Sequence, residues 1–278
     1  MKDMQQTLRL RVQELLESGD VKYVIGWEAT RTDSKTRTAF IRSPQDSNRL
    51  VWNSNCVTST SKYLLDDRWS EGKIGVCVRG CDSRAVNRML ADKQIQRENL
   101  YLIGLPCDGK NNPVCDRCAH KNPLIFDELI GDPVEDKPSP LRFADVELTE
   151  HAPLEERREY WEKQFEKCIR CYACRNVCPA CNCRECFADQ YRTGWQGKQM
   201  NTAQNMNFGL TRAYHVGDRC IECGECERVC PMNLTIMRQP GKILKDINSL
   251  FGSYECGLSP EEVTALGEYN LADADEFN

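Results

Sequence analysis

Eight cysteines of the chain form two nearly identical runs, and their spacing is that of iron–sulfur ligands. The first run is Cys168-Ile-Arg-Cys171-Tyr-Ala-Cys174-Arg-Asn-Val-Cys178-Pro179, and the second is Cys220-Ile-Glu-Cys223-Gly-Glu-Cys226-Glu-Arg-Val-Cys230-Pro231. Both follow the pattern Cys-x2-Cys-x2-Cys-x3-Cys-Pro, in which thiolates hold a cubane 4Fe–4S cluster. The duplication therefore predicts two clusters, and clusters of this kind take up and release single electrons.

The fourth cysteine of each run is expected to serve the cluster of the other run. In this pattern the first three cysteines surround one cluster, while the fourth, before proline, reaches its neighbour. We therefore expect one cluster on Cys168, Cys171, Cys174 and Cys230, and a second on Cys220, Cys223, Cys226 and Cys178. In this respect the segment resembles the bacterial two-cluster ferredoxins.

Three other kinds of site use cysteines at similar spacing. Zinc takes its four ligands as two pairs, which fits three cysteines plus a crossed fourth poorly. Disulfides fit poorly as well, because cysteines two residues apart cannot all pair with acceptable geometry. Cys174-x3-Cys178-x2-Cys181 has the spacing of radical-SAM enzymes. The roughly 100 residues that follow it are, however, too few for the barrel of those enzymes.

Composition and charge restrict the class of protein. The chain has 278 residues, 28% of them charged, and a net charge of −5, which argues against a general nucleic-acid binder. No run of about 18 apolar residues occurs, so no membrane span is predicted. The charged stretch 1–16 is not expected to be a secretory signal, and a cysteine-rich chain without one is expected to bind metal. Exposed clusters tolerate oxygen poorly, so we expect an anaerobic cytoplasm.

Strands and helices alternate before the two runs, which predicts an α/β domain. Helices are predicted over 4–17, 59–65 and 82–93, the last with Asp82 as its N-cap, and strands over 21–27, 36–41, 73–78 and 99–105. Neither a GxGxxG turn nor a phosphate-binding P-loop follows any of these strands.

The second half is predicted to be a ferredoxin-like α+β domain with helix-rich surroundings. We divide the chain into an α/β domain at 1–131, a proline-rich linker at 132–152 and the two-cluster domain at 153–278. Helices are expected over 153–167 and 242–250. A capping box at 259–262 predicts one more helix near the C-terminus, followed by an acidic tail.

Further cysteines follow two of the predicted strands. Cys81 comes after the strand at 73–78, Cys107 after the strand at 99–105, and Cys115 and Cys118 form a Cys-x2-Cys pair. The ends of adjacent strands meet at one edge of an α/β sheet, where such sheets place their sites. We predict a third 4Fe–4S cluster on these four thiolates. Zinc at the same residues, with His120 as a substitute ligand, and unligated thiols are the alternatives.

A family resemblance begins at the first of these strands. Lys73-Ile-Gly-Val-Cys-Val-Arg-Gly-Cys81 and Leu102-Ile-Gly-Leu-Pro-Cys107 resemble the beta subunits of deazaflavin-reducing hydrogenases and formate dehydrogenases. In that family two strands end in Gly-x-Pro-Cys and Gly-x-x-Cys, and a later Cys-x2-Cys completes a 4Fe–4S site beside FAD. The resemblance implies the third cluster and makes FAD a candidate cofactor. Arg79 and Gly80 depart from it, because the family has a small residue and proline there.

Six cysteines and two histidines remain to be assigned. Cys181, Cys183 and Cys186 directly follow the first run and would need a fourth ligand, for which Cys56 and Cys256 are candidates. A fourth cluster, zinc and unligated thiols all stay open for them. Cys77 is expected in the core, His215 in a packing role and His151 in solvent.

These observations predict an iron–sulfur electron-transfer subunit of an anaerobic multisubunit oxidoreductase complex. The ferredoxin half is similar to relay subunits of hydrogenase, formate dehydrogenase and heterodisulfide reductase complexes, so donor and acceptor chains are the expected partners. One alternative is a flavin-containing subunit that passes hydride to a deazaflavin or nicotinamide. Another is a binding or structural module whose clusters only stabilise the fold. No pattern identifies a catalytic residue.

The charges near the two runs differ in sign. The first run carries Arg170 and Arg175, whereas the second carries Glu222, Glu225 and Glu227. Negative charge opposes the addition of an electron. The cluster on the 220–226 run is therefore predicted to have the lower potential.

Overall fold

The computed structural model describes residues 2–32, 35–66 and 72–267, which fold into two units. The first unit is Met1–Ser139 together with Gly257–Glu262, and the second is Pro140–Cys256 with Val263–Asn278. The change from one unit to the other after Ser139 falls inside the segment expected to be a linker. That segment also contains a helix, α3 (Ala144–Glu150).

The first unit is built on a five-stranded sheet with the order β2-β1-β3-β4-β5. β1 pairs antiparallel with β2, while the pairs β1–β3, β3–β4 and β4–β5 are parallel. The strands are β1 (Tyr23–Ala29), β2 (Thr36–Ile41), β3 (Ile74–Val78), β4 (Leu100–Gly104) and β5 (Glu128–Leu129). Four of them lie where the sequence predicts strands, and β5 was not predicted.

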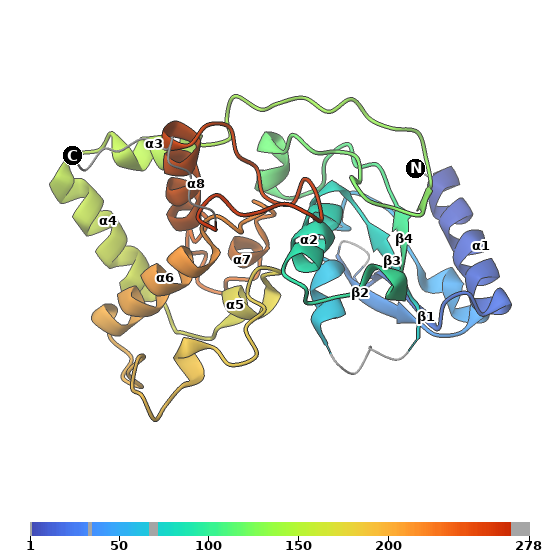
Figure 1. The fold of residues 1–278 in the computed structure, drawn as a ribbon, viewed down its shortest axis with the longest axis horizontal. Coiled ribbons are helices and arrows are strands. Elements are labelled where there is room, and N and C mark those ends of the chain that lie inside the picture. Colours follow the sequence, from blue (N-terminus) through green and yellow to red (C-terminus); the bar gives the residue numbers. More distant parts are fainter. Residues whose placement is uncertain (1, 33–34, 67–71, 268–278) are drawn as a thin grey trace. The chain divides into compact units, whose positions relative to one another are not determined.

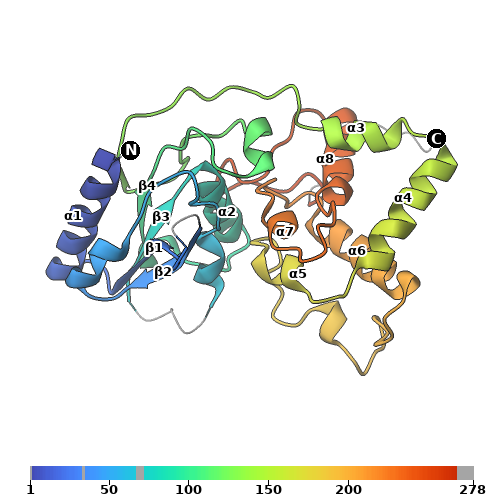
Figure 2. The ribbon, with the colours of Figure 1, turned by 180° about the vertical axis from the view of Figure 1, so that it is seen from behind.

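Helices α1 (Lys2–Ser18) and α2 (Gly80–Ala91) cover opposite faces of this sheet (Figures 1 and 2). Leu8, Val12 and Leu15 of α1 are fully buried in one core with Trp27 of β1. Every residue of β3 is buried, which is why this strand reads as a continuous apolar run. The helix predicted at 59–65 is a 3₁₀ helix, Ser61–Leu65.

The start of α2 differs from the prediction. The N-cap is Arg79, so the assignment of Asp82 as N-cap is wrong. Asp82 is the third residue of the helix, and its carboxylate accepts hydrogen bonds from the Arg79 backbone N–H (3.3 Å) and Nε (2.7 Å). A carboxylate at this position can reach back to the exposed N–H groups of the first turn. Asp82 therefore stabilises the start of the helix as an N-cap residue would, but from the third helical position.

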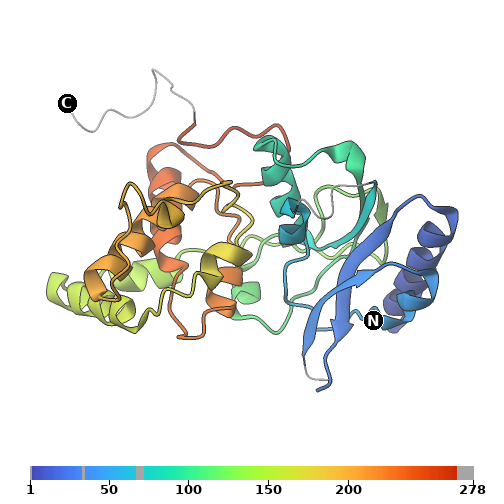
Figure 3. The same cartoon turned by 90° about the horizontal axis from the view of Figure 1, so that it is seen from below.

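The described residues of the second unit form helices joined by turns and irregular chain, and they form no strand. Besides α3 it contains α4 (Leu154–Lys167), α5 (Ala173–Val177), α6 (Thr202–Val216), α7 (Glu225–Arg228) and α8 (Arg238–Leu250). α6 packs against α4 and α8, and α3 against α8 (Figure 3). The helix-rich part of the prediction therefore describes this unit, whereas strands were expected and are not seen in its described part.

The capping box at 259–262 does not start a helix. Residues 251–267 form turns and irregular chain, and the predicted acidic tail at 268–278 lies outside the described residues. The Glu262 carboxylate accepts a hydrogen bond from the Gly257 N–H (2.5 Å) and so does not cap a helix. Residues 257–262 belong to the first unit, where the Asn87 amide donates to the carbonyls of Gly257 (3.0 Å) and Leu258 (3.2 Å).

None of the helices in the described residues is at once long and apolar enough to span a membrane.

Candidate functional site

The two cysteine runs fold into the same backbone shape. Tyr172 (φ 60°) precedes α5 and Gly224 (φ 72°) precedes α7, so the chain turns left-handed at the same place in both runs. Arg170 and Glu222, which also correspond, have φ values of 44° and 58°. A left-handed residue followed by a right-handed one points successive N–H groups into one hollow, a shape found at anion and Fe–S sites. Only Gly224 adopts it without steric cost, so tertiary contacts must hold the other three.

The first three cysteines of the first run lie near the last cysteine of the second. Burial raises the pKa of the Cys168 thiol, and the charges of neighbouring Cys230 and Cys171 raise it further. Burial likewise raises the pKa of Cys174, together with the charges of Cys168 and Cys171. The structure thus brings Cys168, Cys171, Cys174 and Cys230 into one group.

The reciprocal group contains the last cysteine of the first run. Cys178, Cys220, Cys223 and Cys226 all line one cavity, and burial with the charge of Cys178 raises the pKa of Cys220 to about 12. Burial holds the pKa of Cys223 and Cys226 well above the ordinary thiol value, and Cys178 contributes to both. Thiols in such surroundings are protonated until a ligand that needs thiolates binds.

The donor sets fit a cubane by their chemistry. Each of these two groups offers four thiols, all buried or half-buried except the exposed Cys171, and four thiols are the ligand set of a 4Fe–4S cluster. Across the described residues, no three His, Cys, Asp or Glu side chains are arranged to hold a single metal ion. A cubane spreads its four thiolates over the corners of a cube and therefore requires wider spacing than one ion does.

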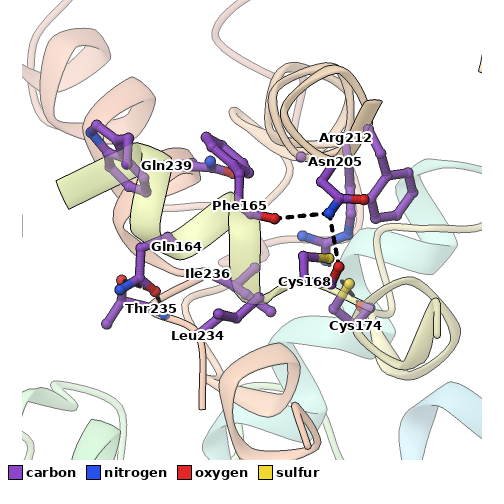
Figure 4. A pocket seen from close by; sticks show the side chains of 13 residues that line it. Gln164, Phe165, Cys168, Cys174, Asn205, Arg212, Leu234, Thr235, Ile236 and Gln239 are labelled. Carbon is purple, nitrogen blue, oxygen red and sulfur yellow. Dashed lines mark hydrogen bonds between the residues drawn. The ribbon is translucent and has the colours of Figure 1, made fainter. Parts of the chain in front are cut away.

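Hydrogen bonds from α6 and the first run fix the loop around Cys168. The Asn205 amide of α6 donates to the carbonyls of Phe165 and Cys168, both at 2.8 Å, and holds the end of α4 in place (Figure 4). The Arg170 guanidinium donates to the carbonyls of Gly197 (2.5 Å) and Lys198 (2.8 Å). The segment between the runs is thereby tied to the first loop.

A third group of thiols lies at the carboxyl edge of the sheet in the first unit. Burial raises the pKa of Cys81 well above its ordinary value, and Cys118 and Cys107 contribute to the rise. Burial and the charges of Cys115 and Cys107 raise the pKa of Cys118. The Cys107 N–H donates to the Lys121 carbonyl at 2.7 Å. The parallel ends of β3 and β4 thus bring these four cysteines together.

Comparison with known proteins places the chain in a family. Residues 164–234 match the model of the 4Fe–4S dicluster domain. The F420-dependent formate dehydrogenase subunit beta of Methanocaldococcus jannaschii is 35% identical, over 69% of this chain and 76% of the relative. The chain belongs to the family of the formate dehydrogenase beta subunits. The resemblance seen at residues 73–107 is thereby confirmed.

Two further relatives of this beta-subunit family member are more distant. The F420-dependent formate dehydrogenase 1 subunit beta of Methanococcus maripaludis is 24% identical, over 56% of this chain and 67% of the relative. The sulfhydrogenase 2 subunit beta of Pyrococcus furiosus is 28% identical, over 27% of this chain and 30% of the relative.

Arg79, where this beta-subunit family member departs from the family pattern, has a structural role. Its guanidinium is buried, lies 2.7 Å from the Asp82 carboxylate and donates to the carbonyls of Cys56 (2.5 Å) and Thr58 (3.0 Å). It also lies over the ring of Trp27, 5.1 Å from the ring centroid. The arginine therefore joins the start of α2 to the loop before it.

The cysteines considered for a fourth site lie in surroundings that differ from one cysteine to the next. Cys183 is exposed. Cys186 lies near Arg175: burial lowers the pKa of this arginine, but Asp189 and Cys186 raise it by more. Cys56 is buried in the core of the first unit, where its thiol donates to the Val51 carbonyl (3.5 Å). Cys181 and Cys256 complete the set of candidates, and the fourth site stays a prediction.

The remaining assignments concern Cys77 and two histidines. Cys77 is fully buried in the core, as predicted. His215 packs edge-on against the ring of Phe187, with centroids 5.3 Å apart, and His151 is exposed at the end of α3.

Sequence reasoning missed two residues of α6, Asn205 and Arg212. Both are buried and both contact the first cysteine run, Arg212 by a hydrogen bond of 3.1 Å to the Cys174 carbonyl. Polar residues in a Gln- and Asn-rich segment read as solvent-exposed, so the sequence offers no signal for either.

Proposed function

We propose that this chain relays single electrons through three 4Fe–4S clusters in an anaerobic, cytoplasmic oxidoreductase complex of the formate dehydrogenase or hydrogenase type. It is an iron–sulfur electron-transfer subunit, as the dicluster domain at 164–234 and the family of beta subunits indicate. A bound cubane supplies one-electron chemistry. The relatives are named as subunits, so the partners here are other chains of a redox complex.

One observation carries the ligand assignment in the second unit. Cys230 is near enough to Cys168 for its charge to raise the pKa of that thiol, although the two belong to different runs, and Cys178 lines one cavity with Cys220 in the reciprocal way. Two clusters with exchanged fourth ligands account for this arrangement, and two independent sites do not. We assign Cys168, Cys171, Cys174 and Cys230 to the first cluster, and Cys220, Cys223, Cys226 and Cys178 to the second.

The third cluster is proposed on Cys81, Cys107, Cys115 and Cys118 of the first unit. The mutual effects of these thiols on one another's pKa support it, as does the family of the chain. Zinc on the same four cysteines is the alternative, but it would require them to draw closer together, because no three His, Cys, Asp or Glu side chains of the described residues are arranged to hold a single metal ion.

Charges around the two runs support unequal potentials. Glu222 pairs with Arg142 at 2.7 Å, and the buried Glu225 pairs with Arg228 at 2.7 Å, so the acidic charges of the second run are compensated in part. Arg170 of the first run has no carboxylate partner among the described residues and bonds to carbonyls and the Met200 sulfur. The net field is more positive at the first run, so we propose the lower potential for the second.

A second function is favoured by the names of two relatives. Both formate dehydrogenase subunits are named as F420-dependent, which means that those proteins act with a deazaflavin. A flavin in this chain would convert single electrons to a hydride for such an acceptor. Flavin content separates this alternative from a pure relay.

Anaerobic quantitation of iron, sulfide and flavin tests these proposals on the purified chain. Three clusters predict about twelve irons, and the Cys115→Ala variant is then expected to retain about eight. Cys77→Ala is the matched control, because this cysteine is buried nearby without belonging to the group and should leave the iron content unchanged. Zinc with about eight irons would replace the third cluster. Fewer than eight irons in the wild type contradicts the paired clusters, and stoichiometric flavin moves the function to hydride transfer.

A further inference from the structure

Arg212 of α6 lies between the two cysteine groups of the second unit. Its side chain is only 5% exposed. It lines the cavity that contains Cys168 and Cys174, and it also lines the cavity that contains Cys178, Cys220, Cys223 and Cys226. Figure 4 shows its guanidinium next to the side chains of Cys168 and Cys174. A single buried cation therefore borders both proposed cluster sites.

The hydrogen bonds of Arg212 leave its Nε–H for a ligand. One terminal nitrogen donates to the Cys174 carbonyl at 3.1 Å. The Nε–H is buried and has no acceptor, and no carboxylate of the described residues forms an ion pair with the guanidinium. A buried donor of a charged group without an acceptor is costly, so such a group indicates a partner that the polypeptide does not supply.

The neighbours of Arg212 identify the chemistry of that partner. Burial lowers the pKa of Arg212, but Cys178, Cys226, Cys181 and Cys174 raise it above its ordinary value, so cysteines of both groups lie near enough to act on its charge. Sulfur of a thiolate or of a cluster is then the acceptor within reach. Hydrogen bonds to sulfur and nearby charge are two of the means by which proteins set cluster potentials.

We infer that Arg212 is a shared positioning residue whose Nε–H bonds to a cluster sulfur and whose charge raises the reduction potentials of both clusters. The inference rests on the paired clusters proposed above. An added electron brings one negative charge, and a fixed cation beside both sites stabilises that charge at either of them. Glu222 and Arg170 lie each within one run, whereas Arg212 acts on both.

The test is an EPR-monitored redox titration of the full chain with three variants. Arg212→Gln removes the charge and is expected to lower both midpoints, by a tenfold or larger change in each reduction equilibrium, which is about 59 mV for one electron. Arg212→Lys keeps the charge, so both of its midpoints should stay close to those of the wild type. Arg158→Gln, the same substitution at an exposed site on α4, is the control and should move neither midpoint. Midpoints of Arg212→Gln equal to those of the control overturn the inference.

A second measurement covers the case in which Arg212→Gln loses its iron. Pulsed EPR of the wild type grown with arginine that carries ¹⁵N in its guanidinium group only should detect nitrogen coupled to the cluster spin, and this coupling should disappear in Arg212→Lys. Its absence from the wild type, or its persistence in Arg212→Lys, overturns the hydrogen bond. Fewer than eight irons in the wild type would instead contradict the paired clusters themselves, so the two failures are distinguishable.

Discussion

Gly80 is the residue at which a single methyl group should remove one proposed cluster and spare the others. It immediately precedes Cys81, and a Cβ added to it would lie 2.1 Å from the His120 carbonyl oxygen and 3.1 Å from that of Asn122. His120 follows Cys118 by two residues, and its carbonyl also accepts a hydrogen bond from the Cys118 thiol (3.4 Å). Gly80→Ala would therefore force the segment that carries Cys81 away from the segment that carries Cys118, although both cysteines belong to the same group.

The size of the displacement decides the expected result. Real Cβ atoms do not approach other atoms closer than 3.0 Å, so Gly80 and His120 must separate by about 1 Å, and backbone cannot rotate away as a side chain can. Metal sites tolerate deviations of about 0.2 Å in ligand distance. The required shift is several times larger than this tolerance. We expect Gly80→Ala to lose about four of about twelve irons and to retain the two clusters of the second unit.

Iron and sulfide quantitation, with EPR of the remaining clusters, measures this outcome. Gly241→Ala is a control of the same chemistry, because its Cβ would meet only the side-chain atom Cγ2 of Val146, at 3.1 Å. If the contact at His120 were harmless, Gly80→Ala would keep its iron and gain about 0.5–1 kcal/mol of stability from the better helix former. That combination would refute the close approach of the two ligand segments.

Three further predictions concern the ligands, the charges and the core of the second unit. Cys178→Ala changes the first run, yet we expect Mössbauer spectra to lose the cluster held by 220–226, and damage confined to the other cluster contradicts the exchange of fourth ligands. Glu222→Gln removes a negative charge and leaves Arg142, 2.7 Å away, with only the more distant carboxylate of Glu255 (3.7 Å), so the midpoint of the same cluster should rise in an EPR titration; an unchanged or lower midpoint would count against the charge argument. Leu244→Ala, at a fully buried position, should cost about 2–5 kcal/mol in denaturant titrations, and a cost under about 1 kcal/mol would mean that this core collapses around the truncation.

Local patterns account for the parts of the fold that the sequence predicts. The helix predicted at 4–17 is observed as α1 and the strand predicted at 36–41 as β2, because each has its own periodicity and clear boundaries. The cysteine ligands can be predicted in the same way, since their spacing is a property of one loop. The two residues of β5 are too few to produce any pattern.

Elements that depend on distant contacts could not be predicted. The buried face of α6 consists of Asn205, Phe208, Arg212, Ala213 and Val216, so nearly half of it is polar and a search for apolar periodicity passes over it. Arg212 acquires its place between the cysteine groups only when α6 packs against both runs. The helix predicted from the capping box at 259–262 does not form for the same reason, because the Glu262 carboxylate accepts a hydrogen bond from the Gly257 N–H instead.

The path of the chain between the two units limits how this protein can be divided. The polypeptide passes from one unit to the other after Ser139, again after Cys256 and once more after Glu262. A fragment that ended at Ser139 would leave the Asn87 amide, 1% exposed, without the Gly257 and Leu258 carbonyls that accept its hydrogen bonds. The α/β half is thus completed by a segment encoded beyond the ferredoxin half. Shuffling of genes could exchange the two together but could not cut one cleanly from the other.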